Sequence, residues 1–235
     1  LPKLLDSIQS YLDRGFNGVK IKIGGVPQRD DLERISATRE AIGPDARLMI
    51  DAVHAYNVPE ALSLAAKAQQ HDIYWFESPI ALADNAGHAV INARAGIPVC
   101  ANESLYGCQN FNDLISRRGT EYVHLDLCAC GGITEARKIS AIAEAHGLPV
   151  TLHSANSVCL FSASINFSAT LSQCDSVEYH QVHQWLRAYA PETTMALTDG
   201  PYVKPLEAPG IGMDFITPDF IDKIAAEIAS DLPAD

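Results

Sequence analysis

Seven short apolar runs, separated by longer stretches of helical periodicity, are the feature of this 235-residue chain that most limits its fold. Strand and helix signals that alternate this often are typical of an α/β fold, in which each helix crosses back over a parallel sheet. The near-regular spacing favours a closed (β/α)₈-type barrel over an open doubly wound sheet, and Gly24-Gly25 is too short for a dinucleotide-binding loop. The predicted strands are residues 18–23, 47–51, 72–77, 97–101, 121–126, 148–153 and 176–178.

The helical stretches set the expected domain organisation. Residues 59–70 and 134–146 have the length of crossover helices, and the chain opens on a further helical segment, residues 4–14. The first strand of a barrel is therefore expected upstream of residue 1. We expect residues 1–180 to form the barrel, and residues 181–235, rich in Pro and Gly, to form an extension of the same domain that packs on it and ends in a helix over 218–230.

Composition limits the partners and the compartment. With 17 basic and 29 acidic residues the net charge is −12, which repels phosphate backbones and anionic lipid. We therefore expect neither nucleic acid nor a membrane as a partner. No apolar run approaches the roughly 20 residues of a membrane-spanning helix. Six scattered cysteines do not resemble a disulfide framework, and they indicate reduced thiols and a cytoplasmic location.

Ionisable residues recur at the ends of the predicted strands. In a (β/α) barrel the carboxyl ends of the strands face the active site. From the second predicted strand onward these residues are 23 to 27 residues apart, about one strand–helix unit, so they should lie side by side around the barrel mouth. They are Lys20, Lys22, Asp51, Glu77, Glu103, Asp126, His153 and Glu178.

Three of these residues predict a metal site. Asp51, Glu77 and Glu103 on neighbouring strand ends would place three negative charges together, and a hard divalent cation is the usual way to offset such a cluster. Three carboxylates leave about half of an octahedral shell for substrate and water, as catalytic Mg²⁺ requires. The alternative is that each acid is a separate surface residue or helix cap, but all three fall at the same phase of the repeat.

The remaining residues predict proton transfer. Lys20 and Lys22 share one face of a strand because strand side chains alternate, and each ammonium should lower the pKa of the other, leaving one as a base near neutral pH. Asp126 and His153 end successive strands, so the carboxylate can fix the imidazole tautomer. Glu178 could donate a hydrogen bond to a substrate carboxylate if neighbouring acids raise its pKa.

These motifs together resemble the mandelate racemase subgroup of the enolase superfamily. The resemblance covers about residues 4–215. It rests on the Lys-x-Lys strand, on Asp51, on Glu77 in Phe-Glu-Ser-Pro, on Glu103 in Ala-Asn-Glu, and on the segment 126–135 with its Gly-Gly-Ile-Thr-Glu end, followed by His153.

The resemblance implies a modified (β/α)₇β barrel that binds one Mg²⁺ and removes the proton α to a carboxylate, giving an enediolate. By position, it makes Lys22 the base with Lys20 tuning its pKa, His153 with Asp126 the opposite acid/base, and Glu178 the hydrogen-bond donor. It also implies a homo-oligomer and a small carboxylate substrate. We expect a lyase that dehydrates an aldonate or aldarate. A racemase or epimerase of a 2-hydroxy acid using the same Lys/His pair, and a non-catalytic barrel, remain open.

Two departures from the family pattern bear on substrate binding. Family members carry an N-terminal α+β capping domain whose loops close over the barrel mouth, and that domain is absent from this sequence. The family motif Asp-x-Asn, whose Asn touches substrate, is replaced here by Asp51-Ala52-Val53. His54 and Tyr56 are the candidates to replace the missing contact.

Overall fold

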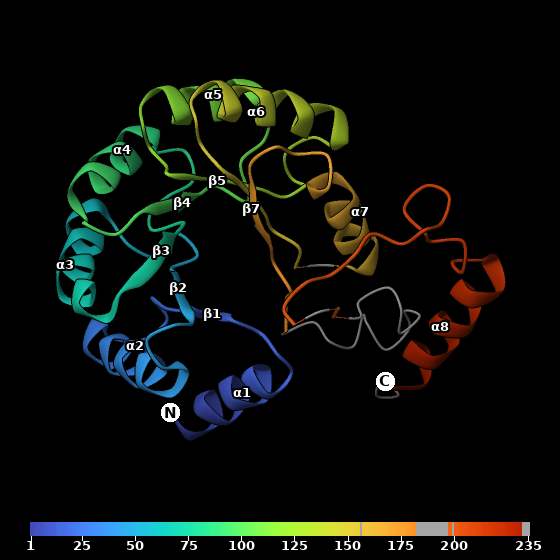
Figure 1. Ribbon diagram of the computed structural model, residues 1–235, viewed down its shortest axis with the longest axis horizontal. Coiled ribbons are helices and arrows are strands. Elements are labelled where there is room, and N and C mark those ends of the chain that lie inside the picture. Colours follow the sequence, from blue (N-terminus) through green and yellow to red (C-terminus); the bar gives the residue numbers. More distant parts are fainter. Residues whose placement is uncertain (156, 182–196, 199, 232–235) are drawn as a thin grey trace.

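A curled parallel sheet surrounded by helices makes up the computed structural model, which describes residues 1–155, 157–181, 197–198 and 200–231 (Figure 1). The strands are β1 (Gly18–Lys22), β2 (Arg47–Asp51), β3 (Ile73–Glu77), β4 (Val99–Ala101), β5 (Tyr122–Leu125), β6 (Val150–Leu152) and β7 (Cys174–Val177). The helices are α1 (Pro2–Asp13), α2 (Gln28–Ile42), α3 (Val58–Ala68), the 3₁₀ turn η1 (Gln69–His71), α4 (Asn85–Arg94), α5 (Cys108–Ser116), α6 (Ile133–Ala145), α7 (Val158–Ser168) and α8 (Pro218–Asp231).

The seven strands pair in chain order, and every pairing is parallel. This confirms the predicted α/β class and the alternation of strands with crossover helices. The bounds of β2 are those predicted, and the other strands differ from the predicted runs by a few residues. The predicted final helix is confirmed as α8, whereas residues 182–196 of the predicted extension lie outside the described residues. No described helix is both long and apolar enough to span a membrane.

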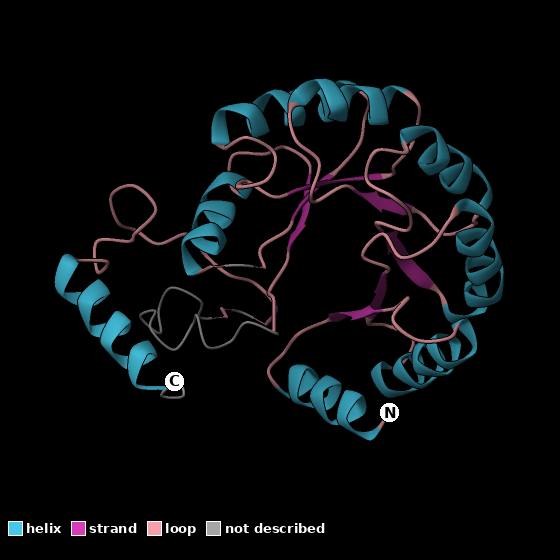
Figure 2. Ribbon diagram, turned by 180° about the vertical axis from the view of Figure 1, so that it is seen from behind, coloured by secondary structure: helices cyan, strands magenta, loops and turns pink. Residues whose placement is uncertain are grey.

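The ring of strands is open between β1 and β7. Within the described part of the chain no ladder joins these two strands, so the seven strands form a curled half-barrel, in agreement with the predicted barrel from which one strand was expected to be missing (Figure 2). Side chains bridge the opening instead. Lys20 Nζ lies 3.1 Å from Glu178 Oε1, and Arg14 Nη1 donates to Gln181 Oε1 at 3.0 Å.

Successive side chains of a strand point to opposite faces of the sheet. One face packs against the helices, and the other lines the inside of the curled sheet, which we call the lumen. On β1, Val19 and Ile21 are buried in the apolar cluster that joins the strands to the helices. Lys20 and Lys22 alternate with them and therefore lie on the other face. The sequence pattern that builds the core thus also aims the amines into the lumen.

Local capping fixes where the outer helices begin. Asn57 forms a capping box with Glu60 at the start of α3: the Asn57 side chain accepts from the Glu60 N–H, and Glu60 Oε2 accepts from the Asn57 N–H. At the start of α4, Asp84 accepts from the Gly87 N–H at 2.7 Å. A Cβ on Gly87 would lie 2.3 Å from Asp84 Oδ2, so only glycine allows this approach.

His88, on α4, has an orphan nitrogen that predicts a pH effect on stability. Its Nδ1–H donates to the Asp84 carbonyl at 2.9 Å, while Nε2 is buried and finds no hydrogen-bond partner in the described part of the chain. Burial lowers the pKa of this imidazole below 6.5. Since the unfolded chain then binds the proton more readily, stability falls as the pH drops below about 6.5.

Between pH 7.5 and pH 5 the wild type should lose up to about 2 kcal/mol more of its unfolding free energy than His88→Leu. Urea titrations at both pH values measure this, with the exposed His146→Asn as control, and an equal loss in His88→Leu would contradict it.

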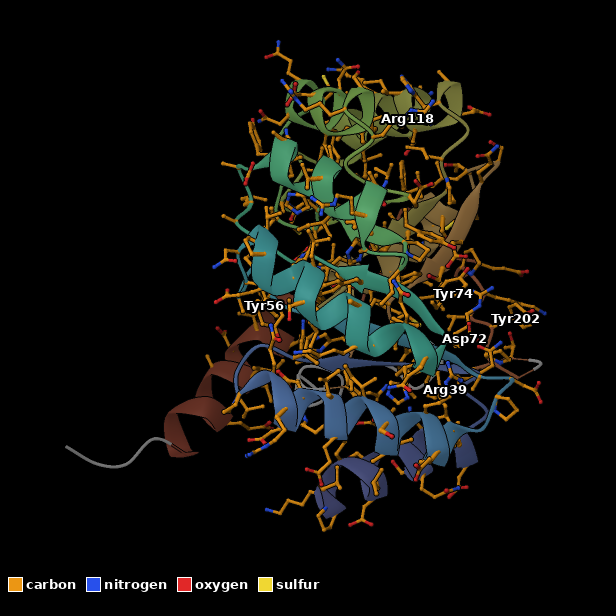
Figure 3. The ribbon with its side chains drawn as sticks, turned by 90° about the vertical axis from the view of Figure 1, so that its left-hand side faces the viewer. Arg39, Tyr56, Asp72, Tyr74, Arg118 and Tyr202 are labelled. Carbon is orange, nitrogen blue, oxygen red and sulfur yellow. The ribbon has the colours of Figure 1, made fainter. Side chains whose placement is uncertain are left out.

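Arg39 on α2 joins two loops at the amino-terminal ends of the strands. Its guanidinium donates to four backbone carbonyls: Gly43 at 2.8 Å, Ala46 at 2.7 Å, His71 at 2.9 Å and Asp72 at 2.8 Å. Figure 3 labels Arg39 and Asp72 next to each other on the right-hand side of the view. One side chain therefore fixes both the α2–β2 turn and the turn that leads into β3.

We expect Arg39→Leu to destabilise the fold by about 3 kcal/mol, because a hydrogen bond from a charged donor contributes about 1.5–3 kcal/mol and several carbonyls would lose their partner. Urea unfolding followed by circular dichroism measures the loss. Arg29→Leu is the matched control, since the Arg29 side chain is 88% exposed. Equal midpoints for the two variants would show that the four hydrogen bonds contribute little.

Candidate active site

Because the strands are parallel, the predicted residues at their carboxyl ends lie along one edge of the sheet, which we call the rim. Lys22, Asp51 and Glu77 are the last residues of β1, β2 and β3. The ladders pair Lys22 with Asp51 and Asp51 with Glu77, so the three positions are neighbours across the sheet. Asp51 and Glu77 are fully buried, and Glu103, just after β4, is 8% exposed.

Lys20 is the most enclosed cation of this rim. Its Nζ lies 2.5 Å from Glu77 Oε1, 3.1 Å from Glu178 Oε1 and 3.5 Å from Asp51 Oδ2. Burial alone would lower the pKa of the ammonium, but the carboxylates of Glu178, Glu77 and Asp51 raise it well above its ordinary value. The predicted fall in pKa is therefore wrong for Lys20, because three carboxylates surround it and outweigh the effect of burial.

Lys22 lies nearer to solvent. Half of its side chain is exposed, against 12% for Lys20, and its Nζ donates to Asp51 Oδ2. Of the two amines, Lys22 is therefore the one that a substrate entering the mouth can reach.

The carboxylates of Asp51 and Glu77 respond differently to the same surroundings. Burial opposes ionisation of Asp51, but Lys20 and Lys22 outweigh it and lower the pKa to about 2. Burial raises the pKa of Glu77 well above its ordinary value; Lys20 opposes this, but the negative charges of Asp51, Glu178 and Glu103 add to it. The rim thus carries more negative charge than its two ammonium groups offset.

Glu103 is held from two sides. Ser78 Oγ donates to its Oε2, and His54 Nε2 lies 3.6 Å from its Oε1. His54 Nδ1 is 2.9 Å from the carbonyl of Ile80 and so carries a hydrogen; in the neutral ring, Nε2 then has a lone pair. That nitrogen is buried and has no hydrogen-bond partner among the described residues.

Tyr56, the other candidate for the missing substrate contact, lies in the loop after β2 and contacts α2 and β3. Its hydroxyl donates to Asp31 on α2 at 3.3 Å, and its ring packs edge-on against Phe76 at 6.4 Å between centroids. Figure 3 labels Tyr56 on the opposite side of the molecule from Arg39 and Asp72. The Tyr56 hydroxyl is thus already bonded to Asp31, whereas His54 has a buried nitrogen without a hydrogen-bond partner among the described residues.

His153 and Asp126 are directly hydrogen bonded. His153 Nδ1 lies 2.7 Å from Asp126 Oδ2, and Asp126 Oδ1 accepts the backbone N–H groups of Cys128 at 2.7 Å and Ala129 at 3.1 Å. Because Asp126 accepts from Nδ1, the second ring nitrogen is left to exchange a proton. That Nε2 lies 3.5 Å from Glu178 Oε2.

Glu178 links the amine side of the rim to the imidazole side. One oxygen is 3.1 Å from Lys20 Nζ and the other is 3.5 Å from His153 Nε2. Burial would raise the pKa of Glu178, but Lys20, His153 and His124 lower it below its ordinary value. The expected protonated Glu178 is therefore wrong for this state of the site, because the cations that face it outweigh the neighbouring acids.

Sequence reasoning missed two lumen residues that contact the predicted ligands. His124 Nδ1 lies 3.6 Å from Glu77 Oε1 and 4.0 Å from Glu103 Oε2, and Trp75 Nε1 donates to Glu77 Oε2 at 3.3 Å. Each precedes a predicted site residue by two positions, His124 before Asp126 and Trp75 before Glu77. The period of two along a strand could therefore have placed both in the lumen.

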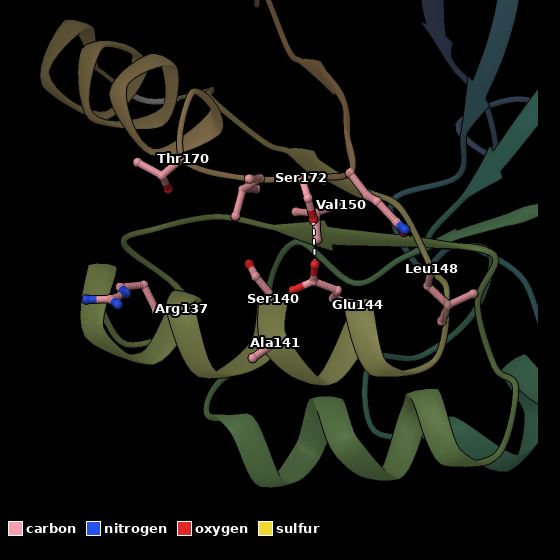
Figure 4. Close-up of a pocket in the computed structure, with 10 residues that line it drawn as sticks. Arg137, Ser140, Ala141, Glu144, Leu148, Val150, Thr170 and Ser172 are labelled. Atoms are coloured by element: carbon pink, nitrogen blue, oxygen red, sulfur yellow. Dashed lines mark hydrogen bonds between the residues drawn. The ribbon is translucent and has the colours of Figure 1, made fainter.

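A pocket of about 240 Å³ lies away from this rim, between α6 and the segment that enters β7 (Figure 4). Ser140, Glu144 and Ser172 are among its lining residues, and Ser172 Oγ donates to Glu144 Oε1 at 2.7 Å. Val150, the first residue of β6, also lines it, so the pocket belongs to the amino-terminal ends of the strands. None of the predicted site residues lines it.

The rim gathers more carboxyl groups than cationic side chains. Five carboxyl groups face two ammonium groups, and no further Lys or Arg contacts them among the described residues. In this structure each of the three predicted ligands has its own protein partner, Lys22 for Asp51, Lys20 for Glu77 and Ser78 for Glu103. The side chains that contact the rim carboxylates include Lys20, Lys22, Ser78, His54, His124 and His153.

Comparison with known proteins assigns the chain to a family. The family model for enolase C-terminal domain-like proteins matches residues 3–219. The chain belongs to this family. This enolase C-terminal domain-like chain is 34% identical over 210 residues to D-galactarolactone cycloisomerase of Agrobacterium fabrum, covering 85% of the chain and 54% of the relative. It is 30% identical over 217 residues to arabinonate dehydratase of Saccharolobus solfataricus, covering 90% and 56%.

Solved structures of the enolase superfamily share the fold. A racemase from Streptomyces coelicolor with bound magnesium superposes with a TM-score of 0.78 at 26% identity, covering 96% of this chain and 60% of that one. L-talarate dehydratase from Polaromonas, complexed with Mg and L-glucarate, gives 0.72 at 27% identity, covering 79% and 48%. The enolase-family chain studied here thus spans about half the length of the curated relatives it matches, and those relatives include dehydratases, cycloisomerases and racemases.

Proposed function

We propose that this chain is the barrel part of a Mg²⁺-dependent hydro-lyase that removes the proton α to the carboxylate of a sugar acid and dehydrates it. The observation that carries the proposal is the rim itself: an amine and a carboxylate-paired imidazole flank a cluster of buried acids. Lys22 Nζ is half-exposed on one side, and His153 Nε2 lies on the other with Asp126 fixing its ring. The aldonate dehydratase and the galactarolactone cycloisomerase among the relatives support the substrate class.

Proton transfer follows from the two flanking groups. Lys22 in its neutral form takes the α-proton, and the electrons of that C–H bond form a C=C bond to the β-carbon. The β-C–O bond breaks, and His153 gives its Nε2 proton to the departing hydroxyl, which leaves as water. Tautomerisation of the resulting enol gives a 2-keto-3-deoxy acid.

Asp51, Glu77 and Glu103 are the residues that would hold the cation, which supplies positive charge against the second negative charge that develops next to the substrate carboxylate. The raised pKa of Glu77 supports this assignment, because a buried carboxyl that resists ionisation beside three other acids gains most from a cation. Lys20 keeps its position between Asp51, Glu77 and Glu178, so it contributes a fixed positive charge and does not act as the base.

A racemase or epimerase is the second candidate. The same amine and imidazole on two sides of a substrate carbon suit removal of a proton from one face and its return to the other, and a magnesium-bound racemase is among the structural relatives.

A panel of aldonates and aldarates, incubated with Mg²⁺ and the full-length protein that contains this chain, tests the proposal. We expect a 2-keto-3-deoxy product from at least one acid, detected with a carbonyl reagent. In D₂O, exchange of the α-proton without loss of water would instead support the racemase. Full-length protein that neither dehydrates nor exchanges any acid of the panel would contradict both and favour a non-catalytic barrel.

His54 is expected to contribute to substrate binding in place of the family's Asn. Its buried Nε2 lone pair can accept a hydrogen bond from a substrate hydroxyl beside Glu103. His54→Phe should raise KM about tenfold, the equivalent of about 1.4 kcal/mol for one lost hydrogen bond, while kcat changes less. Steady-state kinetics measure both constants, and Tyr56→Phe, whose hydroxyl faces α2, is the control. An unchanged KM in His54→Phe would exclude this contact.

A further inference from the structure

Three potential metal ligands of different chemistry lie close together at the acidic rim. Glu77 ends β3, Cys100 lies in β4 and His124 lies in β5, so three consecutive strands each supply one. One ligand atom from each residue lies within 4.8 Å of the other two, and the residues are 0–1% exposed. We call Glu77, Cys100 and His124 the thiol triad.

The imidazole of the thiol triad is unsatisfied in this structure. His124 Nδ1 is buried and has no hydrogen-bond partner among the described residues, although it faces Glu77 Oε1 at 3.6 Å. A nitrogen and an oxygen that bind one tetrahedral Zn²⁺ at about 2.0–2.2 Å are about 3.4 Å apart. The separation of these two atoms is thus already close to what a shared ion requires.

The donor set selects a particular class of ion. A thiolate and an imidazole favour Zn²⁺, Co²⁺ or Cd²⁺, whereas Mg²⁺ prefers oxygen ligands. Three protein ligands leave a fourth position of a tetrahedral ion open. The rim, with Asp51, Glu77 and Glu103, offers only carboxylates and is chemically distinct from the thiol triad.

We propose that the thiol triad binds a thiophilic divalent cation. Glu77 belongs both to the thiol triad and to the three rim carboxylates, so an ion bound to the thiol triad excludes Mg²⁺ from the rim. Only this exclusion of Mg²⁺ rests on the proposed function. Zn²⁺ would then inhibit the protein by competing with Mg²⁺ for Glu77. The other two Zn²⁺ ligands would be Cys100 and His124, which are not among the three rim carboxylates.

Neighbouring contacts allow the ion to enter. Lys20 Nζ, 2.5 Å from Glu77 Oε1, must leave that oxygen, but Asp51 and Glu178 remain within 3.5 Å to hold the ammonium. Trp75 Nε1 donates to the other oxygen, Glu77 Oε2, at 3.3 Å, and such an outer hydrogen bond orients a ligating carboxylate. The Cys100 thiol releases its proton to solvent when it binds the metal.

Cobalt substitution of the full-length protein tests the proposal. After removal of metals with a chelator, Co²⁺ should give a sulfur-to-cobalt charge-transfer band in the near ultraviolet. Cys100→Ala should abolish the band and weaken Zn²⁺ binding at least about 100-fold, since the loss of even an outer-shell partner costs about 10–100-fold. Cys128→Ser, which changes an exposed thiol near the mouth, is the control and should keep the band.

Absence of the band in the wild type, or its persistence in Cys100→Ala, would overturn the thiol triad. Mg²⁺ titration of Cys100→Ala separates the two proposals, because the rim carboxylates are intact in this variant and Mg²⁺ affinity should match the wild type. Full-length wild-type protein that binds Co²⁺ through sulfur but does not bind Mg²⁺ would contradict the proposed function and leave the thiol triad standing. Calorimetry with Mg²⁺ alone and Zn²⁺ alone provides both readouts.

Discussion

Lys22→Ala should lower the rate of α-proton removal by about 10³-fold or more, because general-base catalysis by a positioned side chain contributes about 10²–10⁴-fold. The half-exposed Lys22 amine is the group of the rim that an entering substrate can reach, whereas Lys20 is enclosed by carboxylates. Exchange of the substrate α-proton in D₂O, followed by NMR, measures the step directly and does not depend on whether water is later lost.

Lys67→Ala provides the control for this variant, since Lys67 is an exposed lysine on α3 and should leave exchange unchanged. Circular dichroism should show the same fold for both variants, because the ammonium of Lys22 contacts Asp51 at the rim and not the apolar core. Exchange at the wild-type rate in Lys22→Ala would show that Lys22 is not the base, and His153 would then be the remaining candidate for proton transfer.

Asp51→Asn should lower Mg²⁺ affinity by at least about 100-fold, since losing even an outer-shell partner of a metal site costs about 10–100-fold, and turnover should fall with it. Asp51 is fully buried, and Lys20 and Lys22 lower its pKa to about 2, so it is an anion throughout the working pH range. An amide of the same shape keeps the packing but removes the negative charge. Isothermal calorimetry of the full-length protein with Mg²⁺ measures the loss.

Asp113→Asn is the matched control, because Asp113 is a carboxylate on the outer helix α5 that pairs with Arg117. It should bind Mg²⁺ as the wild type does. Wild-type affinity in Asp51→Asn would show that the cation does not use this carboxylate, and the assignment of Glu77 and Glu103 as co-ligands would lose its basis.

The positions of the site residues were predictable because a parallel sheet imposes one register. Once strands that end at Asp51 and Glu77 are recognised, pairing in chain order must place their carboxylates side by side. The same argument places His153 next to Asp126, since β6 pairs with β5. Two sequence signals made these positions predictable: the apolar runs that mark the strands, and the regular repeat of one strand–helix unit.

The protonation states were not predictable in this way. The pKa of Lys20 depends on Glu178, which approaches it across the open side of the sheet from the far end of the strand order. That same contact lowers the pKa of Glu178, against the expectation. His124 and Cys100 were likewise missed, because their roles depend on the distances between three strands and not on a sequence motif.

Anomalous diffraction from Mn²⁺ bound to crystals of the full-length protein tests the central claim most directly. A single peak about 2.2 Å from one oxygen each of Asp51, Glu77 and Glu103, with the Lys22 amine and the His153 imidazole on either side of the open coordination positions, is the predicted result. A peak that none of these three carboxylates ligates, or a rim without any peak in protein that turns over substrate with Mn²⁺, would contradict it.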